Sequence, residues 1–156
     1  MNKQKATFAA GCFWGVEAHL KEIEGVLDTV VGYTGGEVEN PTYQMVCTNK
    51  TGHAEAVQVI FDSDSITYEE LVRAFFELHN PTTPNRQGLD VGSQYRSAIF
   101  HHNDEQRQIA EQVQQELNES GKFRREIVTE IVPSGDFFKA EEYHQDYHAK
   151  HSFRRS

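Results

Sequence analysis

Short segments with the periodicity of a β-strand alternate along this sequence with segments that have the periodicity of an α-helix. Strand-like apolar runs cover residues 6–10, 26–33, 53–62, 97–101 and 127–132, and helical patterns cover residues 15–24, 67–78, 103–121 and 137–150. Elements that alternate in this way fold as helices packed on one sheet. Some connections suit a hairpin and others a crossover, so we predict a mixed sheet in a two-layer α+β sandwich. The specific core that we expect is a ferredoxin-like, split β-α-β plait.

Local signals mark several element ends. The run Thr67-Tyr68-Glu69-Glu70 is a capping box, and Asn103 precedes a helical pattern that ends near Gly121. Asn40 followed by Pro41 predicts a short helix that runs to residue 47, with the asparagine as its cap. Residues 80–94 form a polar segment without periodicity, and long loops of this kind are often functional.

The composition excludes several classes of protein. The 156 residues suit one catalytic domain over residues 1–156, which we expect to be a monomer. The 24 acidic and 15 basic side chains give a net charge of −9, which disfavours nucleic-acid and anionic-membrane partners. No apolar stretch is long enough to span a bilayer, and no signal peptide precedes the first strand, so we expect a cytoplasmic protein. Two cysteines in such a compartment predict free thiols and not a disulfide scaffold.

The run Gly11-Cys12-Phe13-Trp14-Gly15 lies where the first strand passes into the first helix. Unpaired N–H groups and the positive end of the helix dipole favour an anion there, so we expect the Cys12 thiol to ionise readily and to act as a nucleophile. The two aromatic residues that follow offer an apolar wall beside the sulfur. A small buried cysteine that packs as a hydrophobe is the other interpretation, and the residues alone favour the two about equally.

Five blocks of this sequence, in this order, resemble the peptide methionine sulfoxide reductase A family. They are residues 11–15 (GCFWG), 32–36 (GYTGG), 40–43 (NPTY), 51–57 (TGHAEAV) and 87–97 (QGLDVGSQYRS). The blocks keep the family's order and spacing, and the resemblance covers residues 7–150. It implies an oxidoreductase that repairs oxidised proteins or peptides by reducing the S-epimer of methionine sulfoxide, free or protein-bound, to methionine.

The resemblance also implies a role for each matched residue. Cys12 would attack the sulfoxide sulfur and become a sulfenic acid, while Phe13 and Trp14 would hold the methyl group of the substrate. His144 and Tyr147, from the run Tyr143-His144-Gln145-Asp146-Tyr147, would border the site.

Four further residues would act on the sulfoxide oxygen. Glu55 would protonate it or hydrogen-bond to it, because this oxygen leaves poorly until it is protonated. Tyr43 and Tyr95 would hold the same oxygen through their hydroxyl groups, and Asp90 would support the site. Apolar neighbours in the strand would keep Glu55 protonated near neutral pH, although a strand glutamate taken alone more often faces solvent.

Recycling of the oxidised cysteine departs from the pattern of many relatives, which carry resolving cysteines in a C-terminal tail. Residues 149–156 of this chain contain no cysteine. We therefore expect an external thiol to reduce Cys12: thioredoxin, glutaredoxin with glutathione, or dithiothreitol. Cys47 is the remaining candidate for a resolving cysteine, but a buried packing cysteine is the favoured interpretation of it. We expect no bound cofactor and no metal.

Two other classes of function remain open from the residues. The first is a cysteine hydrolase in which His53 or His144 activates Cys12. The second is a non-catalytic module that binds exposed methionine side chains with its aromatic residues. A metal site from Glu141, His144 and His148 on the predicted last helix is less favoured than a polar helix face.

Overall fold

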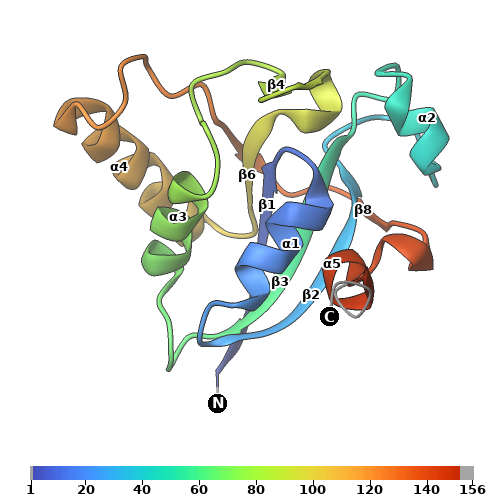
Figure 1. Ribbon diagram of the computed structural model, residues 1–156. Coiled ribbons are helices and arrows are strands. Elements are labelled where there is room, and N and C mark those ends of the chain that lie inside the picture. The colour runs from blue at the N-terminus through green and yellow to red at the C-terminus, as the bar shows by residue number, and fades with distance from the viewer. Residues whose placement is uncertain (1, 152–156) are drawn as a thin grey trace.

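The computed structural model describes residues 2–151, and six strands in it form one mixed sheet in the order β7-β6-β1-β3-β2-β8 (Figure 1). The strands are β1 (Lys3–Ala10), β2 (Val26–Thr34), β3 (Ala54–Asp62), β6 (Ser97–His101), β7 (Glu130–Pro133) and β8 (Phe137–Lys139). The pair β6 and β7 is parallel, and the other neighbouring pairs are antiparallel. The predicted α+β class with a mixed sheet is confirmed.

Two helices, α1 (Phe13–Lys21) and α3 (Tyr68–Glu77), pack on one face of this sheet (Figure 1). Alternate residues of β1 point to this face, where the ring of Phe8 stacks on that of Phe75 with centroids 5.2 Å apart. Leu20 of α1 joins the same buried cluster. The opposite face of the sheet holds a smaller cluster rich in alanine, which includes Ala9 and Phe100. Most of the apolar core therefore lies between the sheet and these helices.

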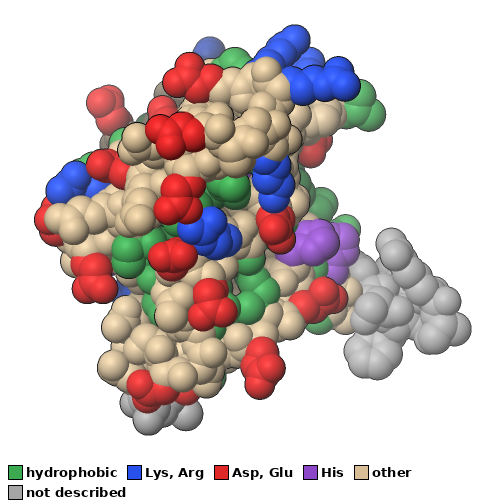
Figure 2. Space-filling model, turned by 90° about the vertical axis from the view of Figure 1, so that its left-hand side faces the viewer, with side chains coloured by type: hydrophobic (Ala, Val, Ile, Leu, Met, Phe, Trp, Pro, Cys, Tyr) green, Lys and Arg blue, Asp and Glu red, His purple; other side chains and the backbone are tan. Residues whose placement is uncertain are grey.

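The longest helix, α4 (Asp104–Ser120), lies beside α3 (Figure 1). Its predicted ends are confirmed, since Asn103 accepts the N–H of Gln106 and Gly121 closes the helix with φ 76. Figure 2 shows acidic side chains spread over this side of the molecule, with lysine and arginine gathered at the upper edge. Arg73 of α3 pairs with Glu116 of α4 at 2.6 Å. Exposed pairs of this kind add little to stability.

Other helix starts were predicted with mixed success. Thr67 and Glu70 form the expected capping box at the start of α3. The short helix α2 (Tyr43–Cys47) exists, but the prediction that Asn40 caps it is wrong. Thr42 is the cap, and its hydroxyl accepts the N–H of Met45, whereas Asn40 has φ 48 and lies in the turn before the helix.

The continuous helix predicted over residues 137–150 is wrong. The chain instead forms strand β8, a short 3-10 helix η2 (Glu142–His144) and a helix α5 (Tyr147–His151). Strand β8 pairs with β2, whose edge would otherwise have unpaired N–H and C=O groups. This tertiary pairing overrides the local helical pattern.

The polar segment 80–94 contains two two-residue strands, β4 (Arg86–Gln87) and β5 (Asp90–Val91), which pair with each other. The 3-10 helix η1 (Ser93–Tyr95) follows them. Within residues 2–151, none of the helices has both the length and the apolar character that crossing a bilayer requires.

Candidate active site

Cys12 lies between the end of β1 and the first turn of α1, at the cap position of that helix. Gly11 makes the turn with φ 103, a conformation that side chains rarely adopt. A Cβ on this glycine would lie 2.9 Å from Cγ of Gln87, so the segment 80–94 packs closely over the turn. Cys12 is partly buried, and its predicted place at the strand-to-helix junction is confirmed.

The thiol of Cys12 is less acidic than an ordinary cysteine. Burial is the main cause that raises its pKa to about 11, and the charges of Glu55 and Asp90 act in the same direction. The N–H groups of Trp14 and Gly15 lower the pKa by less. The expectation of a readily ionised thiol is therefore wrong for the substrate-free protein, because desolvation of the thiolate outweighs the helix N-terminus.

Glu55 reaches the start of α1 from the neighbouring strand β3 and is 1% exposed. Its Oε1 accepts the N–H of Phe13 at 3.2 Å, and its Oε2 accepts from Nε2 of Gln94 at 3.4 Å. Burial raises the pKa of Glu55 to about 7 in spite of these two hydrogen bonds, and Asp90 contributes to the rise. The expected dry surroundings are confirmed, and about half of the carboxyl groups carry a proton at neutral pH.

The two tyrosines predicted to hold an oxygen atom both lie near this carboxyl group. Burial raises the pKa of Tyr95 to about 12, and the charges of Glu55 and Asp90 raise it further. Burial also raises the pKa of Tyr43, together with a hydrogen bond to Cys47 and the charge of Glu55. Both hydroxyl groups therefore keep their protons and can donate hydrogen bonds at neutral pH.

Cys47, at the end of α2, is exposed and belongs to the same cluster. Its Sγ lies 3.5 Å from Nε2 of Gln94, the amide that also binds Glu55. The interpretation of Cys47 as a buried packing residue is wrong, because α2 turns this sulfur towards the site. The resolving role stays a prediction.

Aromatic rings line the other side of the cysteine. Trp14 is partly exposed, and its indole stacks on the ring of Tyr147 with centroids 3.8 Å apart and 9° between the planes. The indole N–H donates to Nδ1 of His144 at 2.9 Å. Phe13 is 0% exposed and packs against the rings of Tyr43 and His144. The structure thus brings the predicted aromatic residues together, with Trp14 as the accessible part of the wall.

The histidines that a hydrolase would need are otherwise engaged. Both ring nitrogens of His53 bind the chain over residues 36–38, since Nδ1 accepts the N–H of Gly36 and Nε2 donates to the carbonyl of Val38. Nδ1 of His144 accepts the indole N–H of Trp14, so its Nε2 carries the ring proton and cannot act as a base, and this N–H has no partner among residues 2–151. The geometry therefore favours neither histidine as a base for Cys12.

The metal site considered on the predicted last helix does not form in the described chain, because residues 141, 144 and 148 do not lie on one continuous helix. Glu141 instead accepts the hydroxyl of Tyr33 at 2.9 Å and the N–H of Tyr43 at 3.0 Å. Across residues 2–151 no group of three or more histidine, cysteine, aspartate or glutamate side chains is arranged to hold a metal ion.

One residue of the site, Gln94, was missed in the sequence, and the role of another, Glu141, was assigned wrongly. Gln94 joins Glu55 to Cys47, and Glu141 fixes the start of α2. Gln94 falls inside the block of residues 87–97, and its place in that block was the only signal that could have found it. Glu141 was considered only as a metal ligand, and nothing local indicates its bonds to Tyr33 and Tyr43, because these partners are distant in sequence.

Comparisons with known proteins identify the family. The family model for peptide methionine sulfoxide reductase matches residues 4–156. A peptide methionine sulfoxide reductase MsrA of Methanothermobacter thermautotrophicus is 57% identical over 97% of this chain and 90% of its own length. Reduced Mxr1 from Saccharomyces cerevisiae has a TM-score of 0.91 at 37% identity, over 97% of this chain and 87% of that one.

A second structure of yeast Mxr1, in complex with Trx2, matches with a TM-score of 0.68 at 30% identity, over 94% of this chain and 85% of that one. Both the family model and the curated relative cover far more than half of the sequence. The chain is therefore an enzyme that belongs to the peptide methionine sulfoxide reductase family.

Proposed function

We propose that this enzyme reduces the S-epimer of methionine sulfoxide, in proteins, peptides or the free amino acid, with Cys12 as nucleophile and Glu55 as acid. The observation that carries the proposal is the buried carboxyl group of Glu55, with its pKa near 7, bonded to the N–H of Phe13 next to Cys12. A carboxyl group of this kind can give a proton to an oxygen that must leave.

The first step transfers one oxygen atom and two electrons. The sulfur of Cys12 bonds to the sulfoxide sulfur while Glu55 gives its proton to the sulfoxide oxygen. The hydroxyl group then passes from the substrate sulfur to the sulfur of Cys12. The sulfur–sulfur bond and the substrate's sulfur–oxygen bond break, a new sulfur–oxygen bond makes Cys12 a sulfenic acid, and methionine leaves with an electron pair on its sulfur. Tyr43 and Tyr95 donate hydrogen bonds to the same oxygen, and the nearby charge of Asp90 helps to hold the proton on Glu55.

The second step uses an external thiol. One thiol condenses with the sulfenic acid to release water and form a mixed disulfide, and a second thiol restores Cys12. The complex of yeast Mxr1 with Trx2 supports a thioredoxin-type reductant for this chain as well. Glutaredoxin with glutathione, or dithiothreitol, would supply the same chemistry.

We also propose a specific type of fold for the sheet and its helices. The order β6-β1-β3-β2 of the central strands, connected through α1 and α3, supports a split β-α-β plait with β7 and β8 added at its edges. We also propose that the enzyme acts as a monomer in the cytoplasm.

Only one sulfoxide epimer should be consumed. The methyl group against Trp14, the oxygen at Glu55 and the sulfur at Cys12 are three fixed points, and three fixed points select one hand of a chiral sulfur. A peptide with racemic methionine sulfoxide and dithiothreitol, analysed by chromatography that separates the epimers, should lose the S-epimer alone. Similar rates for both epimers would contradict the proposed site.

Oxidised Cys12 should persist as a sulfenic acid until an external thiol arrives. The amide of Gln94 contacts the sulfur of Cys47 at 3.5 Å and the carboxyl group of Glu55 at 3.4 Å, so it separates Cys47 from the carboxyl group beside Cys12. After one equivalent of substrate, mass spectrometry should find a dimedone adduct on Cys12 and a free thiol on Cys47. The loss of two hydrogens with a cross-linked Cys12–Cys47 peptide would instead identify Cys47 as the resolving cysteine.

A further inference from the structure

The orientation of the Trp14 side chain is set by a distant part of the chain. The indole stacks on Tyr147 and donates its N–H to His144, and both partners lie about 130 residues further along. The helix that carries Trp14 fixes its backbone, but these two contacts fix the plane and the rotation of its ring. The accessible wall beside Cys12 therefore depends on how residues 144–147 are held.

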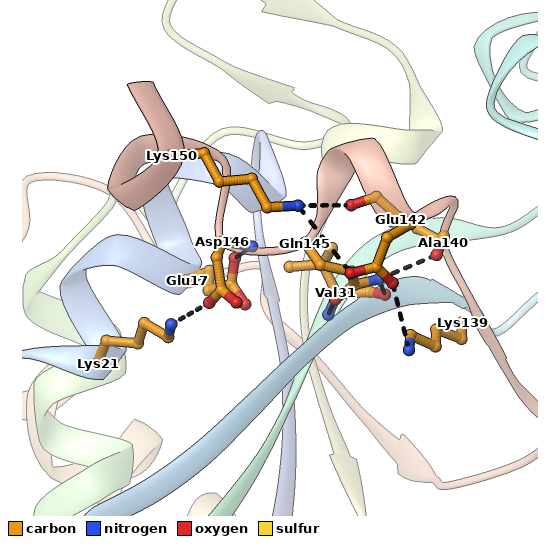
Figure 3. A network of polar contacts seen from close by, with 9 residues as sticks. All are labelled: Glu17, Lys21, Val31, Lys139, Ala140, Glu142, Gln145, Asp146 and Lys150. Carbon is orange, nitrogen blue, oxygen red and sulfur yellow. Dashed lines mark hydrogen bonds and ion pairs between the residues drawn. The ribbon is translucent and has the colours of Figure 1, made fainter. Parts of the chain in front are cut away.

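Gln145, between the two contact residues, is fastened to the edge of β2. Its Oε1 accepts the N–H of Val31, and its Nε2 donates to the carbonyl oxygens of Val31 and Ala140, each at 2.9 Å (Figure 3). The side chain is 6% exposed. The amide thus completes the hydrogen bonds of the strand edge with three bonds in a dry environment, where such bonds are costly to break.

Asp146, the next residue, is fastened to α1. Its backbone N–H donates to Oε1 of Glu17 at 2.8 Å, and Oε2 of Glu17 accepts the hydroxyl of Thr29 at 2.8 Å. Glu17 is 1% exposed, so this carboxylate is buried with both oxygens bonded. An exposed ion pair between Lys21 and Asp146 adds a weaker contact (Figure 3).

We propose that residues 144–147, here called the clamp, act as a positioning element. The clamp holds the indole of Trp14 in the orientation that forms the substrate's methyl pocket. Gln145 fastens the clamp to β2 and Asp146 fastens it to α1, while His144 and Tyr147 hold the indole. The proposal rests on the proposed function for the identity of the pocket. It adds that Glu17 and Gln145, which touch no substrate, determine how tightly the substrate binds.

The state of His144 fits this role. Its Nδ1 accepts from the indole, so the ring must be neutral with its proton on Nε2, and burial lowers its pKa in the same sense. A protonated ring could not accept this hydrogen bond. The clamp therefore uses this histidine as a fixed acceptor.

Trp14 is the only tryptophan in the sequence, so its fluorescence reports the clamp directly. We expect Glu17→Leu, which removes the acceptor for Asp146, and Tyr147→Leu, which removes the stacked ring, to increase acrylamide quenching of Trp14 and to shift its emission to longer wavelength. In both variants KM for a methionine sulfoxide peptide should rise roughly tenfold, with a smaller change in kcat.

Two matched variants separate positioning from general damage. Glu17→Gln keeps an acceptor for the N–H of Asp146, and Lys21→Met removes only the exposed ion pair, so both should keep the fluorescence and KM of the unmodified enzyme. Circular dichroism and thermal unfolding check that each variant is folded. If Glu17→Leu does not fold, Tyr147→Leu provides the test, because Tyr147 is partly exposed.

The outcomes also separate the clamp from the proposed function. A folded Glu17→Leu or Tyr147→Leu enzyme with unchanged Trp14 fluorescence and unchanged KM would overturn the clamp while leaving the reductase activity intact. Changed fluorescence in an enzyme that reduces no sulfoxide would support the clamp and reject the proposed function.

Discussion

Cys12→Ser should reduce sulfoxide turnover to the uncatalysed background while the protein stays folded. A serine hydroxyl is not ionised at neutral pH. Its oxygen also cannot accept the oxygen atom of the substrate, whereas the cysteine sulfur accepts it and becomes a sulfenic acid. Steady-state consumption of a methionine sulfoxide peptide with dithiothreitol measures the loss. Cys47→Ser is the matched control, and it should keep its activity because dithiothreitol reduces Cys12 directly.

The same pair of variants tests whether inactivity reflects the chemistry. The side chain of Cys12 makes no capping hydrogen bond to α1, whereas serine is a favoured cap. The free energy of unfolding of Cys12→Ser, measured by thermal unfolding, should therefore equal that of the unmodified enzyme or exceed it by up to about 1 kcal/mol. Substantial turnover in a folded Cys12→Ser enzyme would move the nucleophile elsewhere.

Glu55→Gln should slow the reduction step by roughly 10²- to 10⁴-fold, the contribution of a general acid. The amide keeps the size of the side chain and can still donate a hydrogen bond, but it cannot give up a proton in the same way. Single-turnover formation of methionine, measured by rapid quench, isolates this step from recycling. An unchanged single-turnover rate would remove Glu55 from the role of acid.

The pH profile gives a second view of the same residue. With pKa values of about 7 for Glu55 and about 11 for Cys12, the free enzyme holds one proton on this pair between these values. Above pH 7 the gain in thiolate is offset by the loss of protonated Glu55, so kcat/KM should level off. In Glu55→Gln only the thiolate titrates, and kcat/KM should keep rising above pH 7.

Stability provides the control for Glu55→Gln. The folded pKa of Glu55 is raised to about 7 from 4.5, so its contribution to stability is full below pH 4.5 and is lost as the pH rises through 7. The glutamine variant lacks this loss. Between pH 4 and pH 8 its unfolding free energy should gain about 3 kcal/mol on the unmodified enzyme. Denaturant unfolding at the two pH values measures this difference.

Features that depend on neighbouring residues could be predicted from the sequence. The junction at Cys12 follows from an apolar run, a glycine and a helical pattern within 20 residues, and the cap at Thr67 needs only residues of the next helical turn. The dryness around Glu55 is different, because the residues alone favoured a solvent-facing glutamate and only the family resemblance implied a buried acid, which burial bears out.

Features set by distant partners could not be predicted. The pKa of Cys12 is raised and not lowered as expected, because β3 and the segment 80–94 bury the thiol and bring Glu55 and Asp90 towards it. The helix expected over residues 137–150 gave way to β8 because the edge of β2 was open to pairing. Gln145 and Gln94 are polar residues without periodicity, and only the folded chain brings their partners together.

On the proposed function, we expect the raised pKa of Cys12 to protect the thiol from oxidation while no substrate is bound. With a pKa of about 11, the thiol is almost entirely protonated at pH 7. Peroxides and electrophiles react with thiolates, so the resting enzyme offers them almost no target. A sulfoxide that fills the site brings its own proton acceptor to Glu55 and the tyrosines, and the reactive form of the cysteine is then needed only while a substrate is bound. We therefore expect the oxidants that create the substrate to react slowly with Cys12 while no substrate is bound.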